Sequence, residues 1–228
     1  HTFQNPLNNK QHSLNTSRAL KALLLGPRRT GKSSTGNTML GRGQVFDTRG
    51  GGASTAASAV TAERHLTVVD AQGWGTCEEF VPKEEKLELL RALSLCGTEG
   101  PHVVLLVIPL MDFTESEKRA VERRMEVFTP AVWRHTMVLF TFGDLLKERG
   151  CSVQEHIQKG GPALRWLMDK CRYQYHVLDN KASQQVRELL SKVEDMLEEN
   201  GGWHFSLHMY QRLEEEWKRR EQQLRALL

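Results

Sequence analysis

The chain has 228 residues, of which 39% are hydrophobic and 26% are charged. This composition is typical of a globular protein with a full core, and the length favours one domain plus an appendage. The formal net charge is only +3, and basic residues alternate with acidic ones, so nucleic acid is not an expected partner. The longest strongly apolar run, residues 103–110, is far shorter than the roughly 20 residues of a transmembrane helix, so no such segment is expected.

The chain divides into three predicted parts. Residues 1–18 are polar and aperiodic, and we expect a flexible N-terminal arm there. A domain over residues 19–200 follows, in which short apolar runs alternate with longer amphipathic stretches. The expected buried strands are residues 19–25, 66–69, 103–108, 137–142 and 175–178. This alternation predicts an α/β fold, with a mostly parallel central sheet and helices on both faces.

Capping signals and helical spacing predict the helices of this domain. Thr114 with Glu117, and Ser152 with Glu155, have the spacing of a capping box. Apolar residues that recur at helical spacing from Ser183 end at residues 200–202, where the domain is expected to close.

Residues 201–228 are predicted to form a C-terminal amphipathic helix with a rough heptad seam. We favour docking of this helix on its own domain over an intermolecular coiled coil, because fewer than three heptads is short.

The segment Gly26-Pro27-Arg28-Arg29-Thr30-Gly31-Lys32-Ser33 is a full GxxxxGKS phosphate-binding loop, and it directly follows the first predicted strand. In such a loop, backbone N–H groups and a helix N-terminus face the phosphates, Lys32 reaches the β- and γ-oxygens, and the Ser33 hydroxyl ligates Mg²⁺. Nucleotide binding is therefore the first hypothesis. The predicted contacts from this loop are Arg29, Thr30, Gly31, Lys32, Ser33 and Ser34.

Further site residues are expected at the ends of later strands. Asp70 can hold the hydration shell of Mg²⁺, and Gly73 completes a DxxG spacing whose N–H can meet a γ-phosphate. In Thr141-Phe142-Gly143-Asp144, a carboxylate can accept the two N–H groups of guanine, for which adenine offers the wrong pattern. Polar residues after the last strand, Asn180 among them, are expected at the same rim of the sheet.

A resemblance to the GIMAP family, the immunity-associated GTPases of the AIG type, is carried by four strings: GKSSTGNTMLG, GPHVVLLVIPLMDFTESEKRAVERRMEVF, LFTFGDLL and YHVLDNK. It covers roughly residues 19–200. The resemblance implies a Ras-like P-loop G domain with an added helix, and GTP or GDP with Mg²⁺ as ligands. It also implies a cytoplasmic or membrane-surface location, and nucleotide-dependent homo- or hetero-oligomers of related G domains.

The chain departs from this family at several positions. Arg29, beside Arg28, stands where a small glycine is usual in the loop, and Phe142 stands where a Lys or His is usual. The sequence DAQG, residues 70–73, replaces DTPG. By its distance from Phe46, Thr55 resembles the Mg²⁺-sensing Thr of the first switch, and Thr48 and Thr61 are the alternatives. The predicted metal ligands are thus Ser33, Asp70 and Thr55.

The residues around Gly73 indicate slow GTP hydrolysis. Ras-like enzymes place a water-orienting glutamine after this glycine, whereas here Gln72 precedes it and Trp74 follows it. We therefore assign no catalytic residue. The favoured interpretation is a guanine-nucleotide switch with slow hydrolysis and nucleotide-dependent self-association. The alternative is a pseudo-GTPase, an interaction or scaffold module that binds nucleotide weakly or not at all. A P-loop enzyme acting on a small molecule is disfavoured, because the sequence has no Arg-rich lid.

Overall fold

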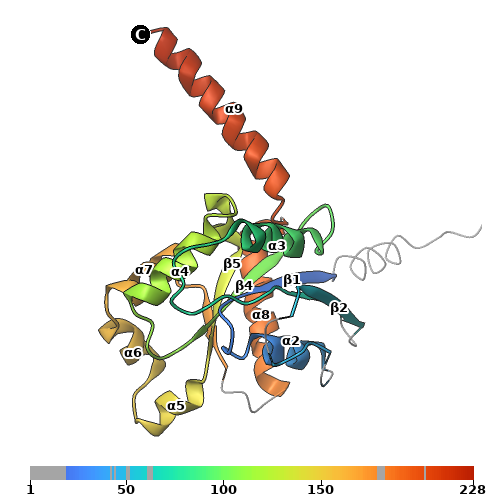
Figure 1. The fold of residues 1–228 in the computed structure, drawn as a ribbon, viewed down its shortest axis with the longest axis vertical. Coiled ribbons are helices and arrows are strands. Elements are labelled where there is room, and N and C mark those ends of the chain that lie inside the picture. Colours follow the sequence, from blue (N-terminus) through green and yellow to red (C-terminus); the bar gives the residue numbers. More distant parts are fainter. Residues whose placement is uncertain are drawn as a thin grey trace, which may run out of the picture.

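The computed structural model describes residues 19–41, 43, 45–49, 52–60, 64–178, 183–202 and 204–228. Within these residues, six strands form one sheet in the order β2-β3-β1-β4-β5-β6, and only β2 runs antiparallel to its neighbour (Figure 1). The strands are β1 (Leu20–Leu25), β2 (Thr55–Val60), β3 (His65–Asp70), β4 (Val103–Pro109), β5 (Thr136–Thr141) and β6 (Tyr175–Val177).

The central strands form because their apolar runs can be buried on both faces of a parallel sheet. All six residues of β5 and the first six of β4 are buried. The five strands predicted from the sequence are confirmed, and each predicted end differs from the observed end by at most one residue. The predicted strand 137–142 is one residue too long at its end. Phe142 lies beyond β5, has a φ of 61° and is the N-cap of the next helix.

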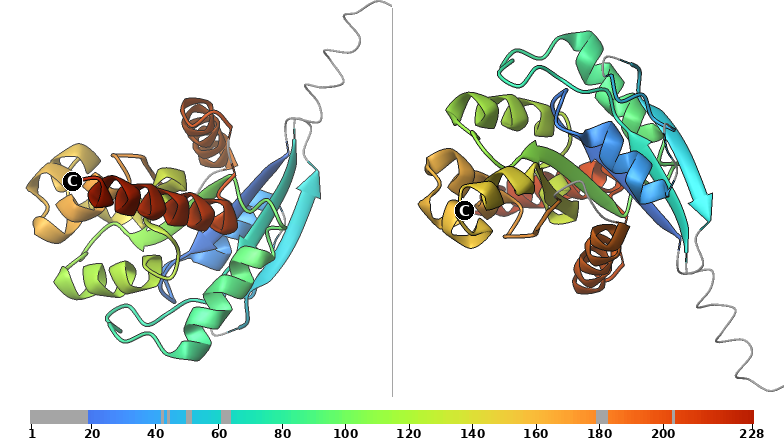
Figure 2. Two further views of the ribbon diagram at one scale, coloured as in Figure 1. Left: turned by 90° about the horizontal axis from the view of Figure 1, so that it is seen from above. Right: turned by 90° about the horizontal axis from the view of Figure 1, so that it is seen from below.

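Helices cover both faces of the sheet, as the alternation of the sequence predicts (Figures 1 and 2). One apolar cluster holds α3 (Lys83–Ser94), α4 (Glu115–Met125), the 3₁₀-helix η1 (Pro130–His135) and α7 (Pro162–Lys170) against one face. A second cluster holds α2 (Lys32–Leu40) and α8 (Ser183–Glu199) against the other face. Along β1, Leu23 joins the first cluster and Leu24 the second, so this strand supports both layers.

The predicted caps are confirmed. Thr114 and Glu117 form a reciprocal capping box at the start of α4, in which the Thr114 N–H donates to Glu117 Oε2 at 3.0 Å. The Ser152 hydroxyl accepts from the Glu155 N–H at 3.1 Å and starts α6 (Val153–Lys159). Because each cap satisfies backbone donors that the first turn leaves unpaired, helix starts are marked locally in the sequence.

Strand β2 was not predicted, because its sequence, Thr-Ala-Ala-Ser-Ala-Val, has neither an apolar run nor a clear alternation. It forms by pairing with β3 over the whole of its length, from Thr55 opposite Asp70 to Val60 opposite His65. Ala57 and Ala59 face the second apolar cluster. The strand is therefore a product of tertiary pairing.

The C-terminal helix α9 (Leu207–Ala226) is anchored at its base. Phe205 is fully buried, and its N–H donates to the Pro101 carbonyl at 2.7 Å. The backbones approach so closely that a Cβ on Gly100 would lie 1.9 Å from the Phe205 oxygen. The Tyr210 hydroxyl hydrogen-bonds His135 Nε2 at 2.8 Å. These contacts fix the first turn of α9 to the domain.

Beyond that turn, α9 extends away from the domain (Figure 1). The seam residues Leu213, Trp217 and Leu224 are exposed, Trp217 to 71%. The expectation that this helix docks on its own domain is therefore wrong for most of its length. None of the described helices is both long enough and apolar enough to span a lipid bilayer.

Candidate nucleotide-binding site

Residues 26–33 form a tight loop between β1 and α2. A Cβ on Gly26 would lie 2.5 Å from the Val107 oxygen of β4, so only glycine fits there. Gly31 has a φ of 82° and precedes the first turn of α2, which has no side-chain cap and no acidic residue. Residues 31–34 line the cavity described below, and an uncapped helix start of this kind is the arrangement that binds phosphate.

Arg29 adopts a φ of 64° in this loop. That region favours glycine, and a non-glycine residue held there costs of the order of 1 to 3 kcal/mol. The loop therefore keeps its glycine-type backbone although the residue has changed.

Lys32, Ser33 and Asp70 meet at one point. The Lys32 ammonium donates to the Asp70 carboxylate and to the Ala71 carbonyl, and the Ser33 hydroxyl donates to Asp70 Oδ2 at 2.6 Å. Lys32 and Asp70 are 7% and 8% exposed. The structure thus brings together the predicted phosphate-binding cation and two of the three predicted Mg²⁺ ligands. A hydroxyl and a carboxylate are the oxygen ligands that Mg²⁺ prefers, so this donor set fits that ion.

A cavity of about 320 Å³ opens beside these residues. Its lining includes the cations Arg28, Arg29 and Lys32 and one carboxylate, Asp47, so the positive charges outnumber the negative one by two. This sign of charge suits a polyphosphate. The other polar residues and the glycines of the lining are Gly31, Ser33, Ser34, Thr48, Gly52, Thr55, Gln72 and Gly73.

The lining of this cavity can be compared with the residues predicted for the first switch. Thr55, the first residue of β2, and Thr48 both line it, so both stay candidates. Thr61 lies outside the described residues, as does Asn180. Thr30 is buried, and its hydroxyl donates to the Pro27 carbonyl at 2.9 Å, which shapes the loop from within.

The residues predicted to read the base are placed beside the phosphate loop. The Thr141 hydroxyl donates to the Thr30 carbonyl at 2.6 Å, which joins the end of β5 to the loop. Phe142 and Asp144 follow at the start of α5 (Gly143–Glu148). The Gly143 N–H donates to the Leu178 carbonyl at 3.1 Å, so the start of α5 is also tied to the segment after β6. Thr141, Phe142 and Asp144 are not among the residues that line the 320 Å³ cavity.

The segment after Asp70 is tied to the loop through its backbone. The Arg28 N–H donates to the Trp74 carbonyl at 2.7 Å, and a Cβ on Gly73 would lie 2.8 Å from Arg28 Cγ. Gly73 is thus required by the close approach of Arg28. Trp74, which follows Gly73, has only 1% of its surface exposed and belongs to the core.

The sequence analysis did not identify the residues that connect the cavity lining to α3. The Gln72 N–H donates to the Ser54 hydroxyl at 2.9 Å, and Ser54 in turn contacts Glu88 and Arg91 of α3. Hydrogen bonds from Arg91 lower the pKa of Glu88 to about 2, so this carboxylate stays charged. Polar residues at these positions read as an ordinary helix surface, and only the fold shows their role.

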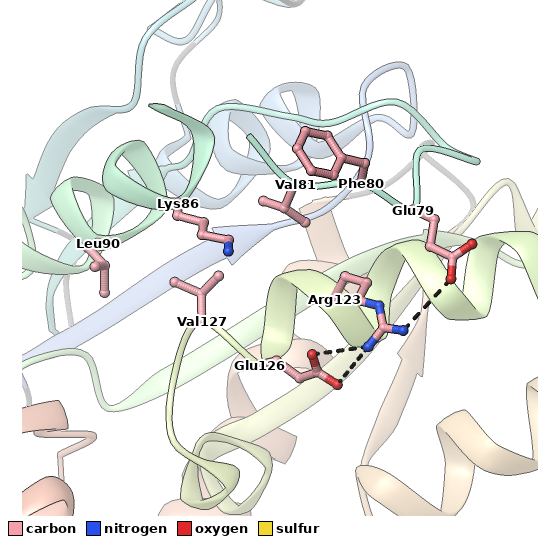
Figure 3. Close-up of a pocket in the computed structure, with 8 residues that line it drawn as sticks. All are labelled: Glu79, Phe80, Val81, Lys86, Leu90, Arg123, Glu126 and Val127. Atoms are coloured by element: carbon pink, nitrogen blue, oxygen red, sulfur yellow. Dashed lines mark hydrogen bonds and ion pairs between the residues drawn. The ribbon is translucent and has the colours of Figure 1, made fainter. Parts of the chain in front are cut away.

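A larger cavity of about 760 Å³ lies between α4 and the segment that leads into α3 (Figure 3). Arg123 pairs there with Glu126 and Glu79, and Lys86 supplies a second cation, so two positive and two negative groups balance. The remaining lining is mostly apolar, with Phe80, Val81, Leu90 and Val127. This balance does not select a polyphosphate, and the smaller cavity is the better candidate for nucleotide.

The fold and the phosphate loop together define a P-loop G domain. A crystal structure of Toc33 from Arabidopsis thaliana, in complex with GDP and Mg²⁺, is similar with a TM-score of 0.60 at 18% identity, over 83% of this chain and 87% of that one. The FeoB G-domain from Methanococcus jannaschii is similar with a TM-score of 0.52 at 16% identity, over 79% of this chain and 99% of that one. Both likenesses concern the fold.

The chain belongs to the AIG1 family, whose model matches residues 20–224. It is 30% identical over 210 residues to Immune-associated nucleotide-binding protein 9 of Arabidopsis thaliana, covering 85% of this chain and 60% of that protein. It is also 30% identical over 194 residues to GTPase IMAP family member 8 of Homo sapiens, covering 80% of this chain and 28% of that protein. The chain thus spans less than two thirds of the length of each of these relatives. The predicted family and fold class are confirmed.

Proposed function

We propose that this chain binds GTP and GDP with Mg²⁺ in the 320 Å³ cavity and acts as a guanine-nucleotide switch. The observation that carries the proposal is the meeting of Lys32, Ser33 and Asp70 at the phosphate loop. The names of the similar proteins, a GTPase and a nucleotide-binding protein, support the same ligand class.

Lys32 has to change partners for this function. Its ammonium pairs with Asp70 and the Ala71 carbonyl, and we expect it to turn to the β- and γ-oxygens of a bound nucleotide. That movement frees the Asp70 carboxylate and the Ser33 hydroxyl to hold Mg²⁺, which neutralises phosphate charge when bound. Asp144 would accept the N–H groups of guanine at the rim, and Thr55 or Thr48 would respond to the γ-phosphate.

Slow hydrolysis is part of the proposal. The position after Gly73 holds the buried Trp74, whose indole cannot orient water as an amide does. Gln72 lines the cavity, but it precedes Gly73 in the sequence, and its backbone N–H donates to the Ser54 hydroxyl. Self-association of related G domains and residence in the cytoplasm or at a membrane surface complete the proposal. For a crystallised neighbour, a chloroplast translocon component, dimerization is described as important for the GTPase activity.

One observation favours a second function, an interaction module without nucleotide. Arg28 packs on Gly73, and its N–H bonds Trp74, so the loop is held against the segment that should meet a γ-phosphate. This contact would weaken or prevent GTP binding if it does not open.

Thermal unfolding with Mg²⁺ and GTP, GDP, ATP or no nucleotide separates the two functions. A ligand at 100 times its dissociation constant stabilises a protein by about 2.7 kcal/mol. For a domain of this size that corresponds to a rise in melting temperature of about 5 to 10 °C. A rise with both guanine nucleotides but not with ATP is the expected result. No rise with any nucleotide would support the interaction module and overturn the switch.

A further inference from the structure

Arg28 lies where the phosphate loop meets the segment after Asp70. Its side chain contacts Gly73, and both residues line the 320 Å³ cavity. Its N–H donates to the Trp74 carbonyl at 2.7 Å, which fixes the backbone at this contact. Because the Gly73 N–H is the group expected to meet a γ-phosphate, Arg28 is the cation of the loop that a third phosphate would attract.

A carboxylate already engages the Arg28 guanidinium. Arg28 Nη2 lies 3.6 Å from Glu78 Oε1, and the two side chains are 47% and 57% exposed. An ion pair this exposed is weak, because water screens both charges. Another anion can therefore displace the Glu78 carboxylate from Arg28.

The protein holds Glu78 from its other side. The Glu78 carbonyl accepts a hydrogen bond from Nη1 of the buried Arg124, and Glu78 Oε2 lies 3.8 Å from Arg124 Nη2. The carboxylate also folds back over Gly75, where a Cβ would lie 2.5 Å from Glu78 Oε1. A larger residue at position 75 would push the carboxylate away. These contacts keep Glu78 beside Arg28.

We propose that Glu78 competes with the γ-phosphate of a bound nucleotide for the Arg28 guanidinium, and so weakens the binding of GTP but not of GDP. GDP lacks the γ-phosphate and can use Lys32 and the start of α2 without displacing Glu78. This competition rests on the proposed function, because it requires a guanine nucleotide in the 320 Å³ cavity. If Glu78 instead oriented Arg28 toward the phosphate, its removal would weaken GTP binding.

The expected effect is modest and measurable. Exposed ion pairs contribute factors of about two to five to an equilibrium constant. Glu78→Gln keeps the size of the side chain and removes its charge. It should therefore raise the affinity for a non-hydrolysable GTP analogue about two- to fivefold, relative to the affinity for GDP.

The test is isothermal titration calorimetry of the whole chain with Mg²⁺ and either GDP or the GTP analogue. Glu79→Gln is the matched control, because it removes the same charge from the next residue, whose carboxylate pairs with Arg119 and Arg123 of α4. The ratio of the two nucleotide affinities should rise in Glu78→Gln and stay near the wild-type value in Glu79→Gln. Thermal melting confirms that both variants fold.

Arg28→Gln shows whether Glu78 acts through Arg28. In a chain that carries Arg28→Gln, the further change Glu78→Gln should leave the ratio unchanged, because the carboxylate no longer has this guanidinium to engage. Arg28→Gln itself should still bind GDP through Lys32 and the loop backbone. Loss of GDP binding would assign Arg28 to a phosphate that GDP shares, and would overturn the proposal.

Four further results would contradict the competition. They are a ratio that does not change in Glu78→Gln, a ratio that falls there, an equal rise in Glu79→Gln, and a rise that persists without Arg28. Each of these leaves the guanine-nucleotide site itself intact, since the wild type still binds both ligands. A wild type that binds neither GDP nor the GTP analogue would overturn the proposed function, and the competition with it.

Discussion

Arg124 of α4 carries a fully buried guanidinium that holds residues 75–82 in place. Its Nε donates to Glu85 Oε1 of α3 at 3.0 Å, and its Nη1 donates to the Glu78 carbonyl. The guanidinium carbon lies 5.6 Å from the centre of the Trp74 ring. The substitution Arg124→Met keeps an apolar side chain of similar length but removes the charge and every donor. We expect it to loosen the segment that follows the nucleotide cavity.

The size of the expected stability loss follows from the burial of Arg124 and Glu85. Breaking a buried ion pair by removing one partner costs about 3 to 5 kcal/mol. The Glu85 side chain keeps 18% exposure and can recover some hydration, which places the expected loss of unfolding free energy near the lower end, at about 3 kcal/mol. A loss of this size lowers the melting temperature of a domain of this length by about 6 to 12 °C.

Urea unfolding, followed by tryptophan fluorescence, measures this loss. Arg123→Met, at the preceding residue, is the matched control. The Arg123 side chain is 49% exposed and pairs with Glu126 and Glu79 at the surface, so its removal should lower the free energy of unfolding by about 1 kcal/mol or less. A double-mutant cycle with Glu85→Gln should show coupling to Arg124. If Arg124→Met costs no more than Arg123→Met, the buried network does not hold this segment.

Three further outcomes are expected. Lys32→Ala should abolish the rise in melting temperature with guanine nucleotides. It should also destabilise the nucleotide-free protein by about 3 kcal/mol, because it leaves Asp70 buried without its cation. Unchanged nucleotide affinity would contradict the site. Asp144→Asn should reduce the shift with GTP without creating one with ATP, since one acceptor for guanine becomes a donor; an undiminished GTP shift would place base recognition elsewhere. Burial lowers the pKa of His135 from 6.5 to about 4. Below pH 6.5 the unfolded chain therefore takes up a proton that the folded protein does not, so the free energy of unfolding should fall by about 3 kcal/mol as the pH drops from 6.5 toward 4. His135→Gln should lose less over that range in pH-dependent urea unfolding, and an equal loss would exclude this histidine as the cause.

Much of the fold was predictable because its signals are local. The apolar runs of β4 and β5 and the caps of α4 and α6 each lie within a few residues of sequence. The phosphate loop is likewise a contiguous motif. In contrast, β2 has no local signal, and it forms because β3 offers a partner along its whole length.

The candidate site was predicted as a set of residues but not as a geometry. The sequence indicated Lys32, Ser33 and Asp70, and the fold shows that they already contact one another, with Lys32 engaged by Asp70. Nothing local in the sequence signalled that Arg28 packs on Gly73 or that Trp74 is buried beneath Arg124. Such contacts join residues that are distant in the chain, so only their packing defines them.

The class of this domain follows from local patterns, because a phosphate loop after a buried strand and the spacing of caps depend on neighbouring residues. The packing of distant segments defines which polar groups face each other in the cavity, the burial of Trp74 in the core, and the extension of most of α9 away from the domain. Ion pairs, close backbone approaches and strand edges depend on distances between segments, and these distances exist only after the chain has packed.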